Sequence, residues 1–132
     1  MIIDDEKLQL TLRAALLEAF GYEVVAFQDG GRAIEAFLSK PFDLVITDLL
    51  MPAMTGLDIA YQLKSYNPSV PIILLTGWGR LLEGQDASCR NIDSILSKPC
   101  DATDLLAAVE NLLNRPAGIE MVMAETEPVE VG

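Results

Sequence analysis

Apolar residues are arranged along this chain in two kinds of segment, and the two kinds alternate. Short runs rich in Val, Ile, Leu and aromatic residues, bounded by turn residues, predict strands, whereas apolar residues three or four positions apart predict helices. The predicted strands cover residues 1–3, 22–27, 43–47, 71–76 and 94–96. The predicted helices cover residues 6–20, 32–39, 55–66, 77–91 and 101–114, and internal glycines weaken the fourth of them. Asp101 is placed to cap the last helix.

This strict alternation of strands with helices is typical of a parallel sheet that helices cover on both faces. We therefore expect an α/β three-layer sandwich. In open sheets of this kind, ligands bind beyond the carboxyl ends of the strands, where the strand order changes direction. The residues that directly follow the predicted strands are therefore the first candidates for a functional site.

Polar side chains gather at these strand ends. Asp4 and Asp5 follow the first predicted strand, Asp48 follows the third, Thr76 ends the fourth and Lys98 follows the fifth. Two carboxylates brought to ~4 Å would repel by about 4 kcal/mol at an effective dielectric constant near 20, so positive charge must offset them. A lysine supplies part of that charge. An all-oxygen ligand set without His or Cys favours Mg²⁺ as the source of the rest.

Asp48 stands alone between apolar segments, and this placement suggests a chemical role. A carboxylate held beside a metal ion stays ionised, and carboxylates of this type form aspartyl-phosphates. Phosphoryl transfer requires positioning and positive charge around the phosphoryl oxygens. The hydroxyl of Thr76, the ammonium group of Lys98 and a metal ion would meet that need, and Gly77 would let the backbone approach a phosphoryl group closely.

The composition excludes several other classes of function. The 132 residues are 51% hydrophobic and predict one domain with a substantial core. The net charge of −11 argues against direct binding to nucleic acid. The absence of histidine excludes catalytic triads and metal sites that use histidine. The two cysteines are interpreted as free thiols. Because no segment matches a membrane span or a signal peptide, we expect a cytoplasmic protein without a membrane partner.

The last part of the chain has a different character. From Arg115 onwards it is rich in proline and glutamate and shows no hydrophobic period. Such composition predicts a flexible acidic tail or linker over residues 115–132, which follows a domain of residues 1–114.

Four short motifs resemble the response-regulator receiver domain of two-component signalling. They are DDE at 4–6, DLLMPAMTG at 48–56, TG at 76–77 and KP at 98–99. The resemblance implies a (βα)5 flavodoxin-like fold with a five-stranded parallel sheet in the order 2-1-3-4-5. It also implies a phosphoacceptor module of a phosphorelay, not a turnover enzyme. A sensor histidine kinase or a histidine phosphotransfer protein would donate the phosphoryl group, and a downstream protein target would recognise the changed surface.

The resemblance assigns roles around the metal. Asp48 would accept the phosphoryl group from a partner's histidine. Asp5 would bind Mg²⁺ directly, together with Asp48, and Asp4 would act mainly through water. The backbone carbonyl of Leu50, two residues past the acceptor, would complete the protein's ligands.

The resemblance also assigns roles around the phosphoryl group. Thr76 would donate a hydrogen bond to a phosphoryl oxygen and Lys98 would pair with the group. The backbone at Leu49 and Gly77 would bind it as well. The bond between Lys98 and Pro99 is often cis in this family.

Three features depart from the usual pattern of the family. Only residues 1–3 precede the acidic pair, so we expect a truncated first strand that weakens the sheet. Ile95 occupies a position where many members have Tyr or Phe, which excludes an aromatic ring switch there. Leu50 and Trp78 are apolar at positions that the family resemblance associates with access of the attacking water, and they predict slow dephosphorylation.

Several alternatives stay open at this point. The sequence TGWG at 76–79 is similar to receivers fused to sensor kinases, so a receiver fragment of a hybrid sensor histidine kinase is one alternative. A haloacid-dehalogenase-type phosphohydrolase also uses Asp and Mg²⁺, but it needs a second acid where this chain has Leu50. A phosphorylation-independent binding module is a third. Many receivers dimerise on phosphorylation, so the resemblance also allows a homodimer.

Overall fold

The computed structural model describes residues 1–77 and 90–114. Five strands form one parallel sheet in the order β2-β1-β3-β4-β5, which confirms the predicted topology. The strands are β1 (Ile2–Ile3), β2 (Ala26–Phe27), β3 (Val45–Asp48), β4 (Ile72–Thr76) and β5 (Ser94–Ser97). The helices are α1 (Lys7–Ala19), α2 (Gly30–Ser39), α3 (Gly56–Tyr66) and α6 (Ala102–Leu113). Most of the helix predicted at 77–91 lies outside the described residues.

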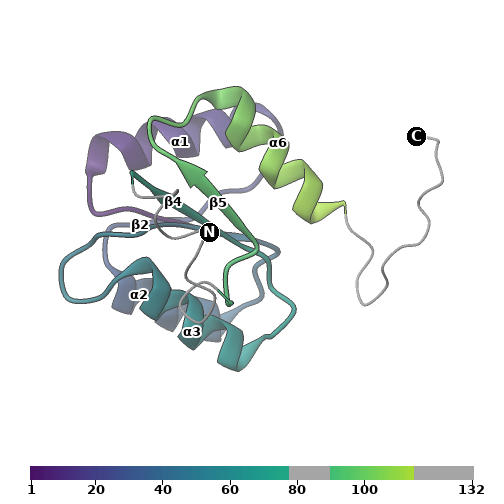
Figure 1. The fold of residues 1–132 in the computed structure, drawn as a ribbon. Coiled ribbons are helices and arrows are strands. Elements are labelled where there is room, and N and C mark those ends of the chain that lie inside the picture. The colour runs from purple at the N-terminus through teal and green to yellow at the C-terminus, as the bar shows by residue number, and fades with distance from the viewer. Residues whose placement is uncertain (78–89, 115–132) are drawn as a thin grey trace.

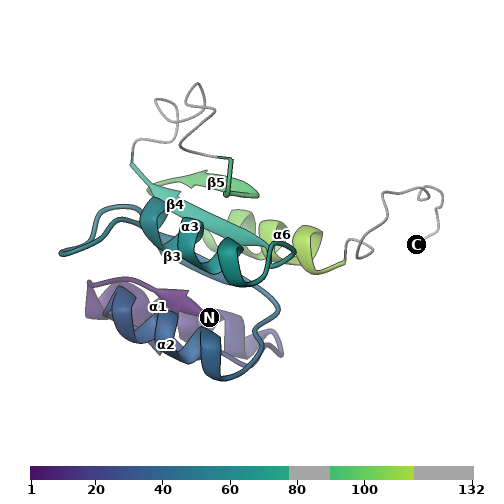
Figure 2. The ribbon, with the colours of Figure 1, turned by 90° about the horizontal axis from the view of Figure 1, so that it is seen from below.

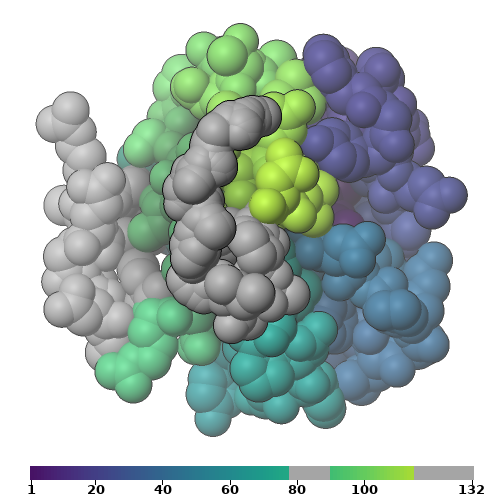
Figure 3. Space-filling model, turned by 90° about the vertical axis from the view of Figure 1, so that its right-hand side faces the viewer, coloured from purple at the N-terminus to yellow at the C-terminus, as the bar shows by residue number. Residues whose placement is uncertain are grey.

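Helices cover both faces of the sheet and make the three layers visible in Figures 1 and 2, with α1 and α6 on one face and α2 and α3 on the other. The space-filling view in Figure 3 shows the same division at the surface. Neighbouring strand residues alternate between the layers: Ile2 packs in the cluster with Leu10 of α1, and Ile3 packs in the cluster with Phe37 of α2. This period of two is what an extended strand imposes on its side chains.

The two outer helical layers bury the middle of the sheet completely. All five residues of β4 and all four of β3 are buried. Each Ile, Leu or Val removed from water in this way contributes roughly 1.5–3 kcal/mol of transfer free energy. The carboxyl ends of β3 and β4 are therefore rigid supports for the residues placed there.

β2 is shorter than the strand that the sequence predicts. The predicted strand at 22–27 contracts to Ala26–Phe27, because within the described residues β2 pairs with β1 alone, which is two residues long. Ile2 pairs with Ala26 and Ile3 with Phe27, so residues 22–25 lie mostly beyond the start of the neighbouring strand. Backbone groups in a strand need a partner strand to form a ladder.

Side-chain caps explain where three of the helices begin. Asp29 accepts a hydrogen bond from Arg32 N at the start of α2. Thr55 and Asp58 form a reciprocal capping box at the start of α3. The predicted cap Asp101 accepts from the backbone N of Asp104 at 2.9 Å. Each such cap stabilises a helix by about 1 kcal/mol.

α1 turns a different face to the sheet from the one its most regular apolar spacing suggests. Leu8 and Leu12 are 66% and 56% exposed, whereas Leu10 and Leu17 are buried. The helix carries two apolar stripes, and the sheet packs against the stripe that contains Leu10 and Leu17. Leu8 and Leu12 of the other stripe face solvent.

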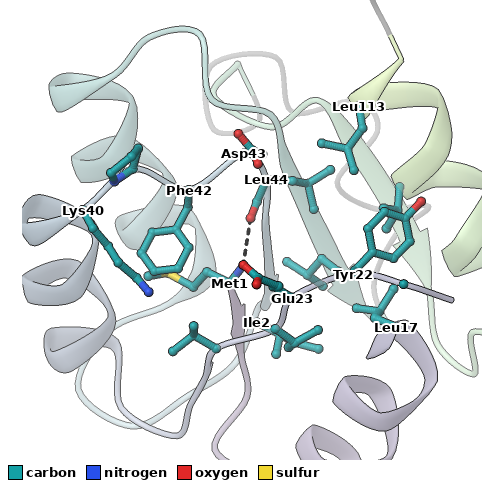
Figure 4. A pocket seen from close by; sticks show the side chains of 16 residues that line it. Met1, Ile2, Leu17, Tyr22, Glu23, Lys40, Phe42, Asp43, Leu44 and Leu113 are labelled. Carbon is teal, nitrogen blue, oxygen red and sulfur yellow. Dashed lines mark hydrogen bonds between the residues drawn. The ribbon is translucent and has the colours of Figure 1, made fainter. Parts of the chain in front are cut away.

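A pocket of about 580 Å³ lies at the amino edge of the sheet, away from the carboxyl ends of the strands (Figure 4). Tyr22, Leu17 and Leu113 lie on one side of it and Lys40 and Phe42 on the other, with Met1 between them. The amino group of Met1 donates to the carbonyl oxygen of Leu44 at 3.0 Å, and burial lowers its pKa to about 6. The pocket is thus lined by the start of β1 and by the segments that lead into β2 and β3.

Candidate functional site: an acidic cluster at the strand ends

The register of the parallel sheet brings the predicted strand-end residues to one edge. Ile3 pairs with Thr47, so Asp4 and Asp48 both come next on adjacent strands. Asp48 pairs with Leu75, which places it one residue from Thr76 across the β3–β4 ladder. These pairs are backbone neighbours, so the convergence follows from the strand order.

Three carboxylates form the cluster. One carboxylate oxygen from each of Asp4, Asp5 and Asp48 lies within 4.8 Å of the others. Asp4 and Asp48 are buried, at 2% and 7% exposure, and Asp5 is exposed. Three like charges at this spacing repel one another strongly in a partly buried site, so the arrangement attracts cations.

Lys98 supplies positive charge directly to Asp48. Its Nζ lies 2.5 Å from Asp48 Oδ1, and its backbone N donates to Thr76 O at 2.9 Å, next to the cis bond between Lys98 and Pro99. Burial raises the pKa of Asp48 above its usual value, and the hydrogen bond and charge of Lys98 act in the opposite direction. The ionised form of Asp48 is therefore incompletely compensated by the protein alone.

A second cation, Arg13, reaches the cluster from α1, and no sequence motif assigns it a role. Its NH1 lies 2.9 Å from Asp4 Oδ2, while Asp4 Oδ1 accepts from Glu6 N at 2.9 Å. A signal existed in the sequence: Arg13 lies on the same helical stripe as Leu10 and Leu17. A basic residue on a core-facing stripe needs a buried partner.

The loop from β3 to α3 holds Asp48 through backbone contacts. Gly56 N donates to Leu49 O at 2.8 Å, and a Cβ at Gly56 would lie 2.3 Å from Asp48 O. Only glycine permits this approach. Ala53 in the same loop has a positive φ of 74°, a backbone conformation that is unfavourable for residues with a Cβ.

Leu49 and Leu50 differ in their availability to a ligand. The N–H of Leu49 donates to the carbonyl oxygen of Leu75 at 3.0 Å, because the β3–β4 ladder continues one residue past Asp48. The expected binding of a phosphoryl group by the Leu49 amide would therefore require the loss of a sheet hydrogen bond. Leu50 is 53% exposed and follows the acceptor into the loop.

The remaining predicted residues lie on β4, β5 and the chain that follows them. Thr76 is buried at the end of β4 and pairs with Ser97, and Gly77 is exposed with open space around its Cα. Ile95 is half-buried and pairs with Leu74. Trp78 falls outside the described residues.

The chemistry of the donors fits a hard divalent cation. Carboxylate oxygens are the ligands that Mg²⁺ takes in proteins, usually one or two with several waters retained. Asp5 is open to solvent and Asp48 adjoins it, so the cluster combines a fixed, buried side with an accessible one.

Comparison with known proteins agrees with this geometry. The family model for the response regulator receiver domain matches residues 1–110. This chain belongs to that family. The family consists of signalling modules, and the chain is a receiver domain with an acidic cluster at the carboxyl edge of its sheet. None of the helices within residues 1–77 and 90–114 combines the length and apolar character needed to cross a bilayer.

Individual relatives are of two kinds. The receiver is 33% identical over 110 residues to the response regulator receiver protein CpdR of Brucella abortus, covering 83% of this chain and 91% of that protein. It is 29% identical over all 132 residues to the transcriptional regulatory protein ZraR of Klebsiella oxytoca, but spans only 30% of that protein's length.

Among solved structures, the receiver is similar to the response regulator protein TrrA of Thermotoga maritima, determined in complex with Mg²⁺ and BeF. The TM-score is 0.78 with 31% identity, and the match covers 85% of this chain and 96% of that one.

Proposed function

We propose that this receiver accepts a phosphoryl group on Asp48 from a phosphohistidine of a sensor histidine kinase or histidine phosphotransfer protein. The observation that carries the proposal is the convergence of Asp4, Asp5 and Asp48 within 4.8 Å, with Lys98 on the acceptor. The cluster supplies both a nucleophilic carboxylate and a place for the counter-charge that phosphoryl transfer needs.

The proposed reaction forms one bond and breaks another. A carboxylate oxygen of Asp48 attacks phosphorus, the P–N bond of the donor breaks, and the partner's imidazole leaves. Lys98, which now pairs with Asp48, is close enough to follow the new negative charge onto the phosphoryl oxygens. The hydroxyl of Thr76 and the N–H of Gly77 are the remaining proposed donors from this chain.

Bound Mg²⁺ would supply positive charge against the phosphoryl oxygens and the acidic cluster. Asp5, Asp48 and the backbone carbonyl of Leu50 are the residues that would hold it. Asp4 contributes its charge from behind, where its two oxygens already accept from Glu6 N and Arg13.

The phosphorylated receiver would signal through a changed protein surface to a downstream target. We place the domain at residues 1–114, followed by a linker or tail at 115–132. Because the chain spans 30% of the length of ZraR, the proposal applies equally to a separate regulator and to a receiver within a larger protein, a hybrid sensor kinase included.

The direct test is phosphorylation by a small donor such as acetyl phosphate or phosphoramidate. The wild-type chain should form an acid-stable, base-labile phosphoprotein with Mg²⁺ and none with excess chelator, and Asp48→Asn should form none. Labelling of Asp48→Asn to the wild-type level would overturn the assignment of the acceptor. Steady release of product from a generic phosphate ester would instead favour a phosphohydrolase.

A further inference from the structure

Arg13 occupies an unusual place for a cation. It comes from α1, from the stripe that packs on the sheet, and its side chain is only 12% exposed. Its guanidinium meets Asp4, whose side chain is 2% exposed, at 2.9 Å. A charge pair this deep is held in one place by the surrounding core.

Both carboxylate oxygens of Asp4 already accept a hydrogen bond from the protein in this arrangement. Oδ2 accepts from Arg13 and Oδ1 accepts from Glu6 N. A metal ion that used Asp4 would have to share a carboxylate oxygen with one of these donors, and one of them carries a full positive charge. Asp5, by contrast, is exposed.

Arg13 and Lys98 differ in how easily their side chains can move away from the acidic cluster. The Lys98 side chain is 30% exposed and ends a flexible stem, so it can move when another cation or a phosphoryl group arrives. Arg13 is anchored between the helix and the sheet. Because only 12% of the Arg13 side chain is exposed, it has less room than Lys98 to move its charge away from the cluster.

We propose that Arg13 is a built-in counter-cation that competes with the divalent metal for the acidic cluster and so sets its affinity for Mg²⁺. The inference rests on the proposed function, since it concerns the same cluster. A unit positive charge ~6 Å from a divalent cation weakens binding about tenfold even at a water-like dielectric constant. Arg13 thus acts through Asp4 and through the local field, as a positioning residue.

The test is calorimetric titration of the full 132-residue chain with MgCl2 at fixed ionic strength. Arg13→Gln is the main variant, because its amide keeps a hydrogen-bond donor for Asp4 while it removes the charge. Arg13→Lys keeps the charge. Lys40→Gln is the matched control, since it removes one positive charge from an exposed position at the opposite edge of the sheet (Figure 4).

We expect Arg13→Gln to bind Mg²⁺ about tenfold more tightly than wild type, and Arg13→Lys and Lys40→Gln to stay within about twofold of it. The rise in melting temperature at a fixed Mg²⁺ concentration should also be larger for Arg13→Gln, because tighter binding to the folded state stabilises it more. This second measurement applies even if the variant is less stable without metal.

The outcomes separate this inference from the proposed function. Mg²⁺ binding by the wild type with unchanged or weaker binding by Arg13→Gln would overturn the role of Arg13 alone. Equal tightening in Lys40→Gln would reduce the effect to net charge and also overturn it. Binding by Arg13→Gln but not by wild type would support Arg13 and refute the proposed function, and binding by neither would overturn both.

Discussion

Lys98 Nζ lies 2.5 Å from Asp48 Oδ1, although the two residues are 50 positions apart and come from non-adjacent strands of the sheet. Asp48 is the proposed phosphoryl acceptor, and Lys98 is the cation that would pair with the phosphoryl oxygens after transfer. Burial nevertheless raises the pKa of Asp48, because one partly exposed ammonium group does not replace the water that the carboxylate has lost.

Asp48→Asn should raise the melting temperature at neutral pH in the absence of Mg²⁺. The pKa of Asp48 is raised in the folded state, so above that pKa its ionised carboxylate disfavours folding, and a neutral amide removes the effect. As the pH falls towards the ordinary value of 3.8, folded Asp48 takes up a proton before the unfolded chain does. The advantage of the variant should therefore shrink on acidification.

The control for this prediction is Glu110→Gln, which removes a negative charge from an exposed position on α6. It should change the free energy of unfolding by less than about 0.5 kcal/mol. The melting temperatures of wild type, Asp48→Asn and Glu110→Gln are measured by thermal unfolding from neutral to acid pH. A lower melting temperature for Asp48→Asn at neutral pH would contradict the raised pKa.

Lys98→Ala should slow phosphorylation by a small donor about 10²-fold, because a preorganised charge aimed at the phosphoryl oxygens is lost. Lys98→Arg keeps the charge and should retain much more of the rate. The initial rate of phosphoprotein formation with Mg²⁺ is the measurement. Equal rates for Lys98→Ala and wild type would exclude Lys98 from the reaction.

Gly56→Ala should destabilise the fold by about 1–3 kcal/mol, the usual range for overpacking, or more if the backbone cannot move. The new Cβ would lie 2.3 Å from Asp48 O and 2.8 Å from Leu74 Cδ1, so the end of β3 must shift. Urea unfolding measures the loss. Gly77→Ala is the control, since nothing lies within 4 Å of a Cβ there, and equal stability losses in both variants would argue against the steric account.

Ala53→Gly should stabilise the protein by about 1 kcal/mol, because glycine adopts a positive φ without the steric penalty that alanine carries. The φ of Ala53 is 74°. The same change at Ala107, exposed within α6, should destabilise by about 1 kcal/mol through helix propensity. Opposite signs in urea unfolding are the expected result, and a loss of stability at both positions would show that Ala53 carries no strain.

Most of the layout could be predicted from local pattern. The alternation of strand and helix periods indicated the layered sheet, and the polar residues after each strand indicated the edge that bears the site. The predicted ends of the strands and helices were less accurate. The strand expected at 22–27 shortened because pairing depends on a neighbour, and β1 supplies only Ile2–Ile3.

Two details of the site depended on contacts that no local pattern encodes. Binding of a phosphoryl group by the Leu49 backbone stays a prediction, and the structure adds that the Leu49 N–H donates to Leu75 O in the β3–β4 ladder. Arg13 was not assigned at all, because its meeting with Asp4 depends on how α1 lies over the sheet.

The sequence by itself determined the order of the elements, the parallel sheet and the identity of the acids and the lysine at its carboxyl edge, because hydrophobic periods and residues at strand ends are properties of short segments. Only the tertiary structure decided which stripe of α1 is buried, with Leu10 inside and Leu8 outside, and that Arg13 therefore enters the acidic cluster. The reason is physical: α1 has two apolar stripes of similar quality, and packing against the sheet selects between them.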